Sequence, residues 1–304
     1  MKRYNSLNDY LKNKFNKKVY KLAIDCSFTC PNRDGTKGTG GCIFCSQKGS
    51  GDFAESGSDV KAQLEKAKQK LKNKVPQDAG YIAYFQSFTN TYADVKTLEK
   101  LYLSALEVND VVALSVATRP DCINDENVAL LSKINKTTPV FVELGLQTAN
   151  ENTAKYINRC YENDEFTLAV KKLREHNIEV VVHLILGLPN ETQSDMLNTV
   201  DFINRHDIQG VKFQLLHVLE NTALAKYDYT PLTMDEYFSV LGECINRLRP
   251  DIVIHRLTGD GDKKVLIAPE WSANKKHVLN SLNKYLEQNN IIQGQYATVD
   301  GLLF

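Results

Sequence analysis

Four of the seven cysteines in this chain lie within one polar segment, between Cys26 and Cys45. Cys42 and Cys45 form a Cys-x-x-Cys pair, and a glycine-rich loop separates this pair from Cys30. Thiolates gathered on such a loop suit a metal ion or an iron–sulfur centre, whose charge keeps the thiols deprotonated. A structural disulfide is the alternative, and the absence of other secretory features argues against it.

The chemistry depends on how many of these thiolates bind. A structural zinc ion or an ordinary four-iron cluster takes four protein ligands, which here would include Cys26. Three ligands, from Cys30, Cys42 and Cys45, would leave one iron open, as a catalytic zinc keeps a position for its substrate. Both alternatives follow from the residues alone.

The elements that must position this loop alternate regularly along the chain. Six strands are predicted, at residues 19–25, 80–85, 111–117, 140–146, 179–186 and 210–216. A helical pattern follows each strand, and a short strand at 252–255 and a helix at 274–288 come last. This alternation predicts an α/β fold with parallel strands and right-handed crossovers, in one open sheet or a barrel.

Polar side chains follow these strands at the end where parallel α/β folds bind ligands. The cysteine loop follows the first strand, and the segment 86–92 follows the second. Glu143, Gln147, His183 and His217 lie within or just after later strands. We therefore expect an active site at this face.

Composition excludes few classes of function. The chain has 304 residues, 42% of them hydrophobic, with 37 basic and 37 acidic side chains. Residues 1–21 carry a local charge of +6 among aromatic residues, which suits either an amphipathic helix packed on the domain or contacts to RNA. The polar start, the odd cysteine number and the lack of long apolar runs predict a cytoplasmic protein without membrane contact.

The cysteine loop closed by Cys-x-Phe-Cys, and the GLP sequence of the fifth strand, resemble the radical S-adenosylmethionine (radical SAM) superfamily. The resemblance implies a partial (β/α)6 TIM-like barrel that holds a [4Fe-4S] cluster through three cysteines. The open iron chelates S-adenosylmethionine, which is cleaved to methionine and a 5′-deoxyadenosyl radical. The spacing of Cys30, Cys42 and Cys45 departs from the common Cys-x3-Cys-x2-Cys and is similar to the Elongator catalytic-subunit-like branch.

Six segments together resemble the bacterial YhcC/YtqA family within this superfamily: TCPNRDGTKGTGGCIFC, YFQSFTNTYA, VATRPDC, VELGLQTAN, HLILGLPNET and LLHVLENT. In that family a small residue usually stands at the position of Cys26, which favours Cys30, Cys42 and Cys45 as the cluster ligands. The expected division is a basic N-terminal arm (1–18), a radical SAM core (19–250) and a helical C-terminal extension (251–304).

The resemblance also implies residues that bind S-adenosylmethionine. Phe44 is expected near the adenine, and Arg159 is expected to pair with the methionyl carboxylate. At two positions where relatives have acids this chain has Ala117 and His183, so Glu143 is a candidate substitute. The predicted cofactor-binding set is Phe44, Gln86, Ser87, Thr89, Glu143, Gln147, Arg159 and His183.

The predicted catalytic residues are His183, His217 and Glu143. A histidine inside an apolar strand is about as often a satisfied core residue as a ligand contact, so both interpretations of His183 stay open. For His217 the structural interpretation is the more common one.

Members of the YtqA-like branch are associated with tRNA wobble-uridine modification, in which a 5-carboxymethylaminomethyl group becomes 5-aminomethyl. The resemblance therefore implies tRNA as partner, an electron donor such as flavodoxin or ferredoxin, and a methyltransferase acting on the product amine. Two alternatives are a radical SAM enzyme acting on a small molecule or protein, and a zinc-stabilised RNA-binding module without catalysis.

Overall fold

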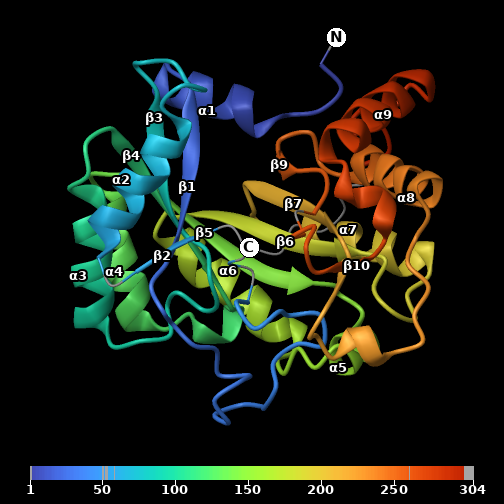
Figure 1. Ribbon diagram of the computed structural model, residues 1–304, viewed down its shortest axis with the longest axis horizontal. Coiled ribbons are helices and arrows are strands. Elements are labelled where there is room, and N and C mark those ends of the chain that lie inside the picture. The colour runs from blue at the N-terminus through green and yellow to red at the C-terminus, as the bar shows by residue number, and fades with distance from the viewer. Residues whose placement is uncertain (1, 50, 52–53, 58, 260, 298–304) are drawn as a thin grey trace.

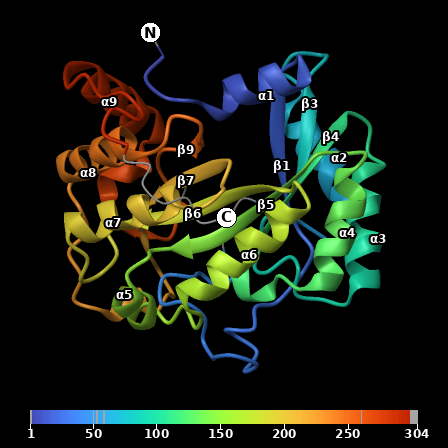
Figure 2. The same ribbon diagram turned by 180° about the vertical axis from the view of Figure 1, so that it is seen from behind.

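The computed structural model describes residues 2–49, 51, 54–57, 59–259 and 261–297. Its main sheet has eight strands in the order β2-β1-β3-β4-β5-β6-β7-β9, and every neighbouring pair is parallel. The strands are β1 (Val19–Asp25), β2 (Glu55–Ser56), β3 (Gly80–Phe85), β4 (Val111–Thr118), β5 (Val140–Gln147), β6 (Glu179–Leu186), β7 (Gly210–Leu215) and β9 (Val253–Arg256). The sheet curls into a half-barrel with helices along its outer side (Figure 1; Figure 2).

The helices that follow the strands begin at side-chain caps. Asn124, Thr192 and Thr233 each form a capping box that satisfies the first free N–H groups of a helix. The helices are α1 (Leu7–Phe15), α2 (Val60–Leu71), α3 (Val95–Leu106), α4 (Asp125–Asn135), α5 (Glu151–Tyr156), α6 (Asn163–Glu175), α7 (Gln193–Asn204), α8 (Met234–Arg247) and α9 (Lys275–Gln288). Three short 3₁₀ turns cover Pro120–Cys122, Leu224–Lys226 and Glu270–Ala273.

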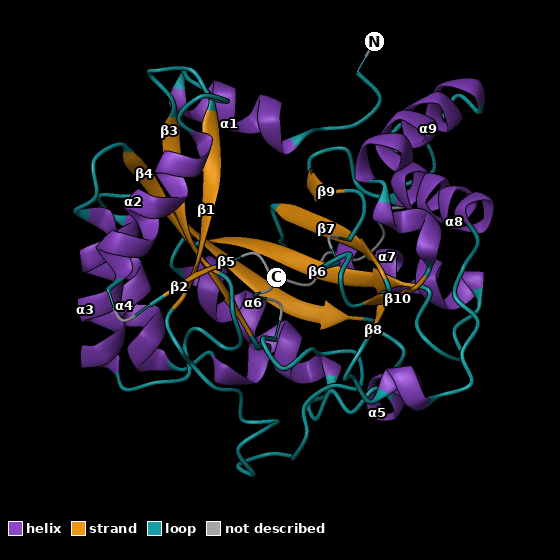
Figure 3. Cartoon of the chain, in the orientation of Figure 1, coloured by secondary structure: helices purple, strands orange, loops and turns teal. Residues whose placement is uncertain are grey.

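The predicted partial (β/α)6 barrel is confirmed, because β1, β3, β4, β5, β6 and β7 are each followed by one or two helices (Figure 3). The strand ends differ from the prediction by about one residue. Sequence analysis missed β2 and a separate antiparallel pair of β8 (Val218–Leu219) and β10 (Leu266–Ala268). These strands have two or three residues, which is too short for a periodic pattern.

Alternate side chains of each strand face opposite sides of the curled sheet. The outward set packs under the helices in a large apolar core. At the base of the barrel, the inward side chains of Ile82, Ala113, Phe141 and Val181 form a separate cluster with Leu11 of α1. Helix α1 therefore closes the amino end of the barrel, opposite the cysteine loop.

The N-terminal arm is anchored at both of its ends. The Tyr10 hydroxyl donates to the Glu179 carboxylate at 2.7 Å, and Lys14 pairs with the same carboxylate. Before α1, the backbone N–H of Asn5 donates to Gln293 Oε1 at 2.8 Å, in the segment after α9. The packed-helix interpretation of the arm is what the structure shows, while contact with RNA stays a prediction.

Replacing Leu11 by alanine tests whether α1 is an integral part of the barrel. Leu11 is 3% exposed, so the change leaves a cavity at the barrel base, and we expect a loss of about 2–5 kcal/mol in the free energy of unfolding. Lys12→Ala, on the exposed side of the same helix, is the matched control and should change it by less than about 0.5 kcal/mol. Urea denaturation measures the free energy of unfolding of both variants. A loss for Leu11→Ala as small as that for Lys12→Ala would show that α1 is dispensable for stability.

Candidate active site

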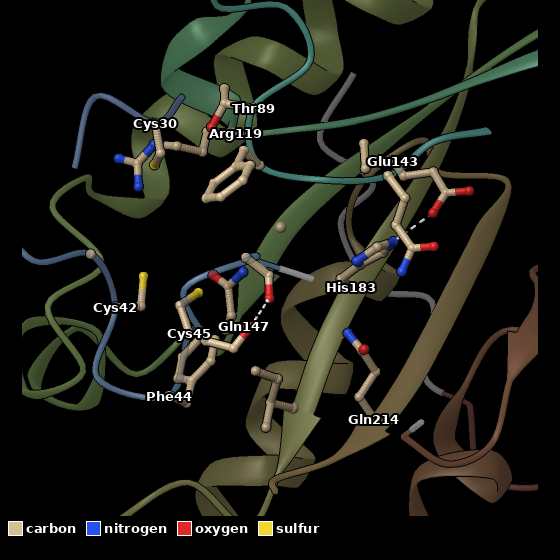
Figure 4. A pocket seen from close by; sticks show the side chains of 18 of the residues that line it. Cys30, Cys42, Phe44, Cys45, Thr89, Arg119, Glu143, Gln147, His183 and Gln214 are labelled. Atoms are coloured by element: carbon tan, nitrogen blue, oxygen red, sulfur yellow. Dashed lines mark hydrogen bonds and ion pairs between the residues drawn. The ribbon is translucent and has the colours of Figure 1, made fainter. Parts of the chain in front are cut away.

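A cavity of about 230 Å³ lies at the carboxyl ends of the strands. Cys30, Cys42 and Cys45 all line this cavity, which we call the cysteine pocket. Figure 4 shows the three cysteines with Phe44 on one side of the pocket and His183 with Glu143 on the other. The predicted convergence of the cysteine loop and the later strand ends is therefore present in the fold.

Side chains within the loop hold the cysteines in place. The Asn32 amide is fully buried and donates to the Cys42 sulfur at 3.7 Å and to the backbone oxygen of Asn158. Arg33 donates to the backbone oxygen of Ser46 at 2.6 Å. Gly41 has a φ of 80°, and a Cβ there would lie 2.9 Å from the Arg33 Nε, so the tight loop requires glycine.

The electrostatic environment of the loop favours one thiolate, at Cys45. A hydrogen bond with Cys42, together with the nearby guanidinium groups of Arg33 and Arg119, lowers the pKa of Cys45 to about 7. The same hydrogen bond and burial raise the pKa of Cys42 well above its ordinary value. Within the described residues no three or more His, Cys, Asp or Glu side chains are close enough to hold a single metal ion. Three thiols sharing a cationic pocket fit a larger polynuclear centre.

Cys26 is not among the residues that line the pocket. Its side chain packs against the apolar core under the helices, and burial raises the pKa of its thiol to about 12. The geometry therefore favours the three-ligand alternative.

Three of the four residues predicted to bind S-adenosylmethionine after β3 and in the cysteine loop line the pocket, namely Phe44, Gln86 and Thr89. Phe44 also packs on the apolar cluster around Ile43. Ser87 is the exception, because a Cβ on Gly51 would lie 1.9 Å from its hydroxyl oxygen. Ser87 thus lies against the backbone of the loop, and its role in cofactor binding stays a prediction.

Gln147 ends β5 with a φ of 64° and lines the pocket. A Cβ on Gly145 would lie 2.6 Å from the Gln147 amide nitrogen, so the side chain folds back over this glycine. Its amide oxygen accepts from the Tyr161 hydroxyl at 3.3 Å. A left-handed residue at the end of a strand is a local strain of the kind found at ligand sites.

Arg159 touches the pocket but is fully buried, and the protein already uses all of its N–H donors. They reach three backbone oxygens and the side chains of Glu151 and Asn163, at 2.8–3.2 Å. This arrangement favours a positioning role, in which Arg159 holds the turn after β5, over the predicted direct pairing with a methionyl carboxylate.

Glu143 is fully buried in the barrel lumen, and four side chains surround its carboxylate. Ser115 donates to Oε1 at 2.6 Å and His183 Nε2 lies 2.7 Å from Oε2, while Lys21 and Lys212 pair with one oxygen each. Although burial opposes ionisation, the two ammonium groups hold the pKa of Glu143 well below its ordinary value. Glu143 is therefore an anionic hub, with its oxygens already engaged by the protein.

The hub determines the state of His183. Burial and the charge of Lys212 lower the pKa of His183 to about 4, so the ring is neutral at physiological pH. Because the ionised Glu143 can only accept, Nε2 carries the proton and Nδ1 remains an acceptor. His183 lines the cysteine pocket and can accept a hydrogen bond from a bound hydroxyl or amine. This position favours the ligand-contact interpretation over that of a core histidine, and the role of His183 stays a prediction.

His217 lies after β7 and also lines the pocket. Its ring packs against the loop that follows β9, where a Cβ on Gly259 or Gly261 would lie 2.9 or 2.8 Å from it. A catalytic role for His217 stays a prediction.

Sequence analysis missed the charged residues of the lumen, Lys21, Lys212 and Arg256. The signal was a lysine within each of the apolar strands VYKLAID and GVKFQL. Arg119 pairs with Asp121 through two hydrogen bonds of 2.9 and 2.8 Å. It also lines the cysteine pocket.

The depressed pKa of His183 predicts a specific acid sensitivity. Below pH 6.5 His183 is protonated in the unfolded chain but stays neutral in the folded protein. The free energy of unfolding therefore falls as the pH drops from about 6.5 to about 4. In His183→Gln an amide keeps the donor to Glu143 without titrating. Between pH 7.5 and 5 the cluster-free wild type should lose about 1–2 kcal/mol more unfolding free energy than this variant. Urea denaturation at both pH values measures this difference. Equal losses of unfolding free energy in the wild type and in His183→Gln would contradict the depressed pKa of His183.

The sequence of this chain matches a known protein family and several known proteins. Residues 30–203 match the Radical SAM superfamily model and residues 208–288 match the Radical_SAM C-terminal domain model. The chain is 43% identical over 300 residues to the uncharacterized protein YtqA of Bacillus subtilis, covering 97% of this chain and 93% of that protein. It is 33% identical over 286 residues to protein YhcC of Escherichia coli, covering 92% and 91%.

More distant matches agree in fold. The archaeal Elp3 of Methanocaldococcus infernus superposes with a TM-score of 0.68 at 17% identity, over 91% of this chain and 64% of that chain. A tRNA-2-methylthio-N(6)-dimethylallyladenosine synthase of Thermotoga petrophila is 22% identical over 137 residues, 44% of this chain and 31% of that protein. No helix in the described part of the chain has the length and apolar character to span a membrane. With its half-barrel and cysteine loop, the chain belongs to the radical SAM superfamily, among relatives that include YtqA and YhcC.

Proposed function

We propose that this radical SAM enzyme modifies a wobble uridine of tRNA, converting a 5-carboxymethylaminomethyl side chain to 5-aminomethyl. The observation that carries the proposal is a pocket in which the three cysteines face a neutral His183 and a cationic lumen. The 43% identity to YtqA supports it together with the motif resemblance to the YtqA-like branch. The zinc-stabilised module without catalysis does not agree with membership in the superfamily.

Membership brings the cofactors of the superfamily, a [4Fe-4S] cluster and S-adenosylmethionine. Cys30, Cys42 and Cys45 would hold the cluster, with Asn32 donating to one sulfur. When bound, the pair supplies a 5′-deoxyadenosyl radical. Phe44, Gln86, Thr89 and Gln147 would surround S-adenosylmethionine, and His183 Nδ1 would accept from one of its polar hydrogens.

The proposed reaction removes one hydrogen atom from the methylene next to the substrate carboxylate. Overall, the modified uridine, S-adenosylmethionine and water give 5-aminomethyluridine, glyoxylate, methionine, 5′-deoxyadenosine and a proton. The C–N bond to the two-carbon unit breaks, and that carbon is oxidised to an aldehyde while the sulfonium is reduced. No net electron is consumed, so a donor such as flavodoxin or ferredoxin is needed only to prime the cluster.

The positive charge of the N-terminal arm agrees with an RNA substrate. Lys12 and Lys18 remain exposed beside the packed helix α1, where they would contact phosphates. The partial relative that is a tRNA methylthio synthase supports the same substrate class. A tRNA methyltransferase that acts on the product amine would be the downstream partner.

Single cysteine variants test the ligand set. After anaerobic reconstitution the wild type should bind about four irons per chain. Cys42→Ala should lose most of this iron and the brown absorbance, because one of three ligands is missing. Cys26→Ala, in the same segment but outside the pocket, should keep both. Loss of the cluster from Cys26→Ala would show that the three-ligand assignment is wrong.

Nucleoside mass spectrometry tests the reaction. Deleting the gene should make 5-carboxymethylaminomethyluridine accumulate in bulk tRNA while aminomethyl-type nucleosides disappear. In vitro, the reconstituted enzyme should release glyoxylate and 5′-deoxyadenosine in equal amounts with the product nucleoside. An unchanged nucleoside profile together with no turnover in vitro would reject tRNA and favour a small-molecule or protein substrate.

A further inference from the structure

A second cavity, of about 560 Å³, lies between the two edges of the half-barrel. Strands β1 and β2 contribute one wall, and β7 and β9 contribute the other. It shares five lining residues with the cysteine pocket: Tyr84, Gln86, Lys212, Gln214 and Arg256. We call it the lateral cavity. The two cavities therefore lie on either side of a common wall.

Positive charge is concentrated where the two cavities meet. Lys21 and Lys212 both pair with the single carboxylate of Glu143. Arg256 adds a guanidinium close enough to lower the pKa of Lys212 and of His183. Elsewhere in the lateral cavity, Lys70 pairs with Glu55, which also pairs with Lys66.

The neighbouring titratable groups do not offset this charge. His183 is neutral, and burial together with Lys21 keeps the pKa of His255 well below its ordinary value. The Tyr84 hydroxyl accepts from the Lys212 ammonium at 3.1 Å but stays protonated, because burial raises its pKa. Lys212 is only 4% exposed, and burial lowers its pKa to about 7. Because a nearby opposite charge favours the protonated form of a lysine, an anionic ligand at this point would be stabilised by Lys212, Lys21 and Arg256.

We infer that the lateral cavity binds the carboxylate of the substrate, through Lys21, Lys212 and Arg256, and so presents the adjacent methylene to the cysteine pocket. This inference rests on the proposed function for the identity of the substrate. Arg256 is the residue best suited to a planar carboxylate, because a guanidinium offers two parallel donors. The two lysines supply charge from the opposite edge of the barrel.

The chemistry of the proposed substrate matches the two joined spaces. In the 5-carboxymethylaminomethyl group the reacting methylene is bonded directly to the carboxylate carbon. An anion at the shared wall, where Lys212 and Arg256 line both cavities, places that methylene at the junction. A backbone phosphate of the RNA is many bonds from the reacting carbon and has no such fixed relation to it.

The test compares two substrates with the reconstituted full-length enzyme: tRNA carrying 5-carboxymethylaminomethyluridine, and the same tRNA with the carboxylate as a methyl ester. The wild type should prefer the acid by roughly 10- to 100-fold in kcat/KM, the range for a hydrogen-bonded charge. In Arg256→Gln and in Lys21→Met this preference should fall towards one, mainly through a higher KM for the acid. Arg205→Gln, an exposed arginine far from β9 in sequence, is the matched control and should keep the preference.

Two outcomes would overturn the inference. One is a wild type that uses acid and ester equally, and the other is an Arg256→Gln variant that loses both substrates in proportion, as a phosphate contact or misfolding would cause. If the wild type turns over neither RNA, the proposed function fails, and N-methylglycine then probes the cavity alone. Through its carboxylate this compound should raise the thermal midpoint of the wild-type holoenzyme but not that of Arg256→Gln. Equal shifts in both would reject the cavity assignment whatever the substrate.

Discussion

The ionised carboxylate of Glu143 is the interaction on which the interior of this half-barrel depends. It is fully buried, and Lys21 from β1, His183 from β6 and Lys212 from β7 all meet at it. Removing such a group would leave two buried ammonium ions without a partner, which is far more costly than losing an exposed ion pair. One side chain thus holds together strands that are not neighbours in the sheet.

The lumen is layered around this carboxylate. Apolar side chains and Leu11 of α1 fill the base. The charged layer lies above them, and the cysteine pocket lies above the charged layer. This layering meets two requirements of radical chemistry. The apolar base excludes solvent from one end of the barrel, and polar groups lie only in the layers where ligands would bind. Charge in the middle layer serves both the fold and recognition.

Much of the fold could be predicted from the sequence because its signals are local. Each strand and helix has its own periodic pattern, and the cysteines converge because parallel strands end at one face. The three cysteines, Phe44 and Gln147 were found in this way, since their place depends only on the end of a strand or on the loop.

The errors and omissions come from side-chain directions and from contacts between distant strands. The sequence does not show that Ser87 lies against Gly51, or that five local acceptors engage the donors of Arg159. The lumen charges were missed because the pairing of Lys212 with Glu143 spans 69 residues, and that of Lys21 spans 122. No pattern along the chain reports the register of strands that face each other across a barrel.

The anchoring of the N-terminal arm has a consequence for synthesis. Asn5 and Arg3 form hydrogen bonds with Gln293 and Ile291, at a separation of 288 residues in each case. Helix α1 is synthesised long before the partners that fix the residues preceding it. The base cluster around Leu11 needs no residue after Val181, so it can close while the later β/α units are still being made. The segment before α1 is fixed only after Gln293 has been synthesised.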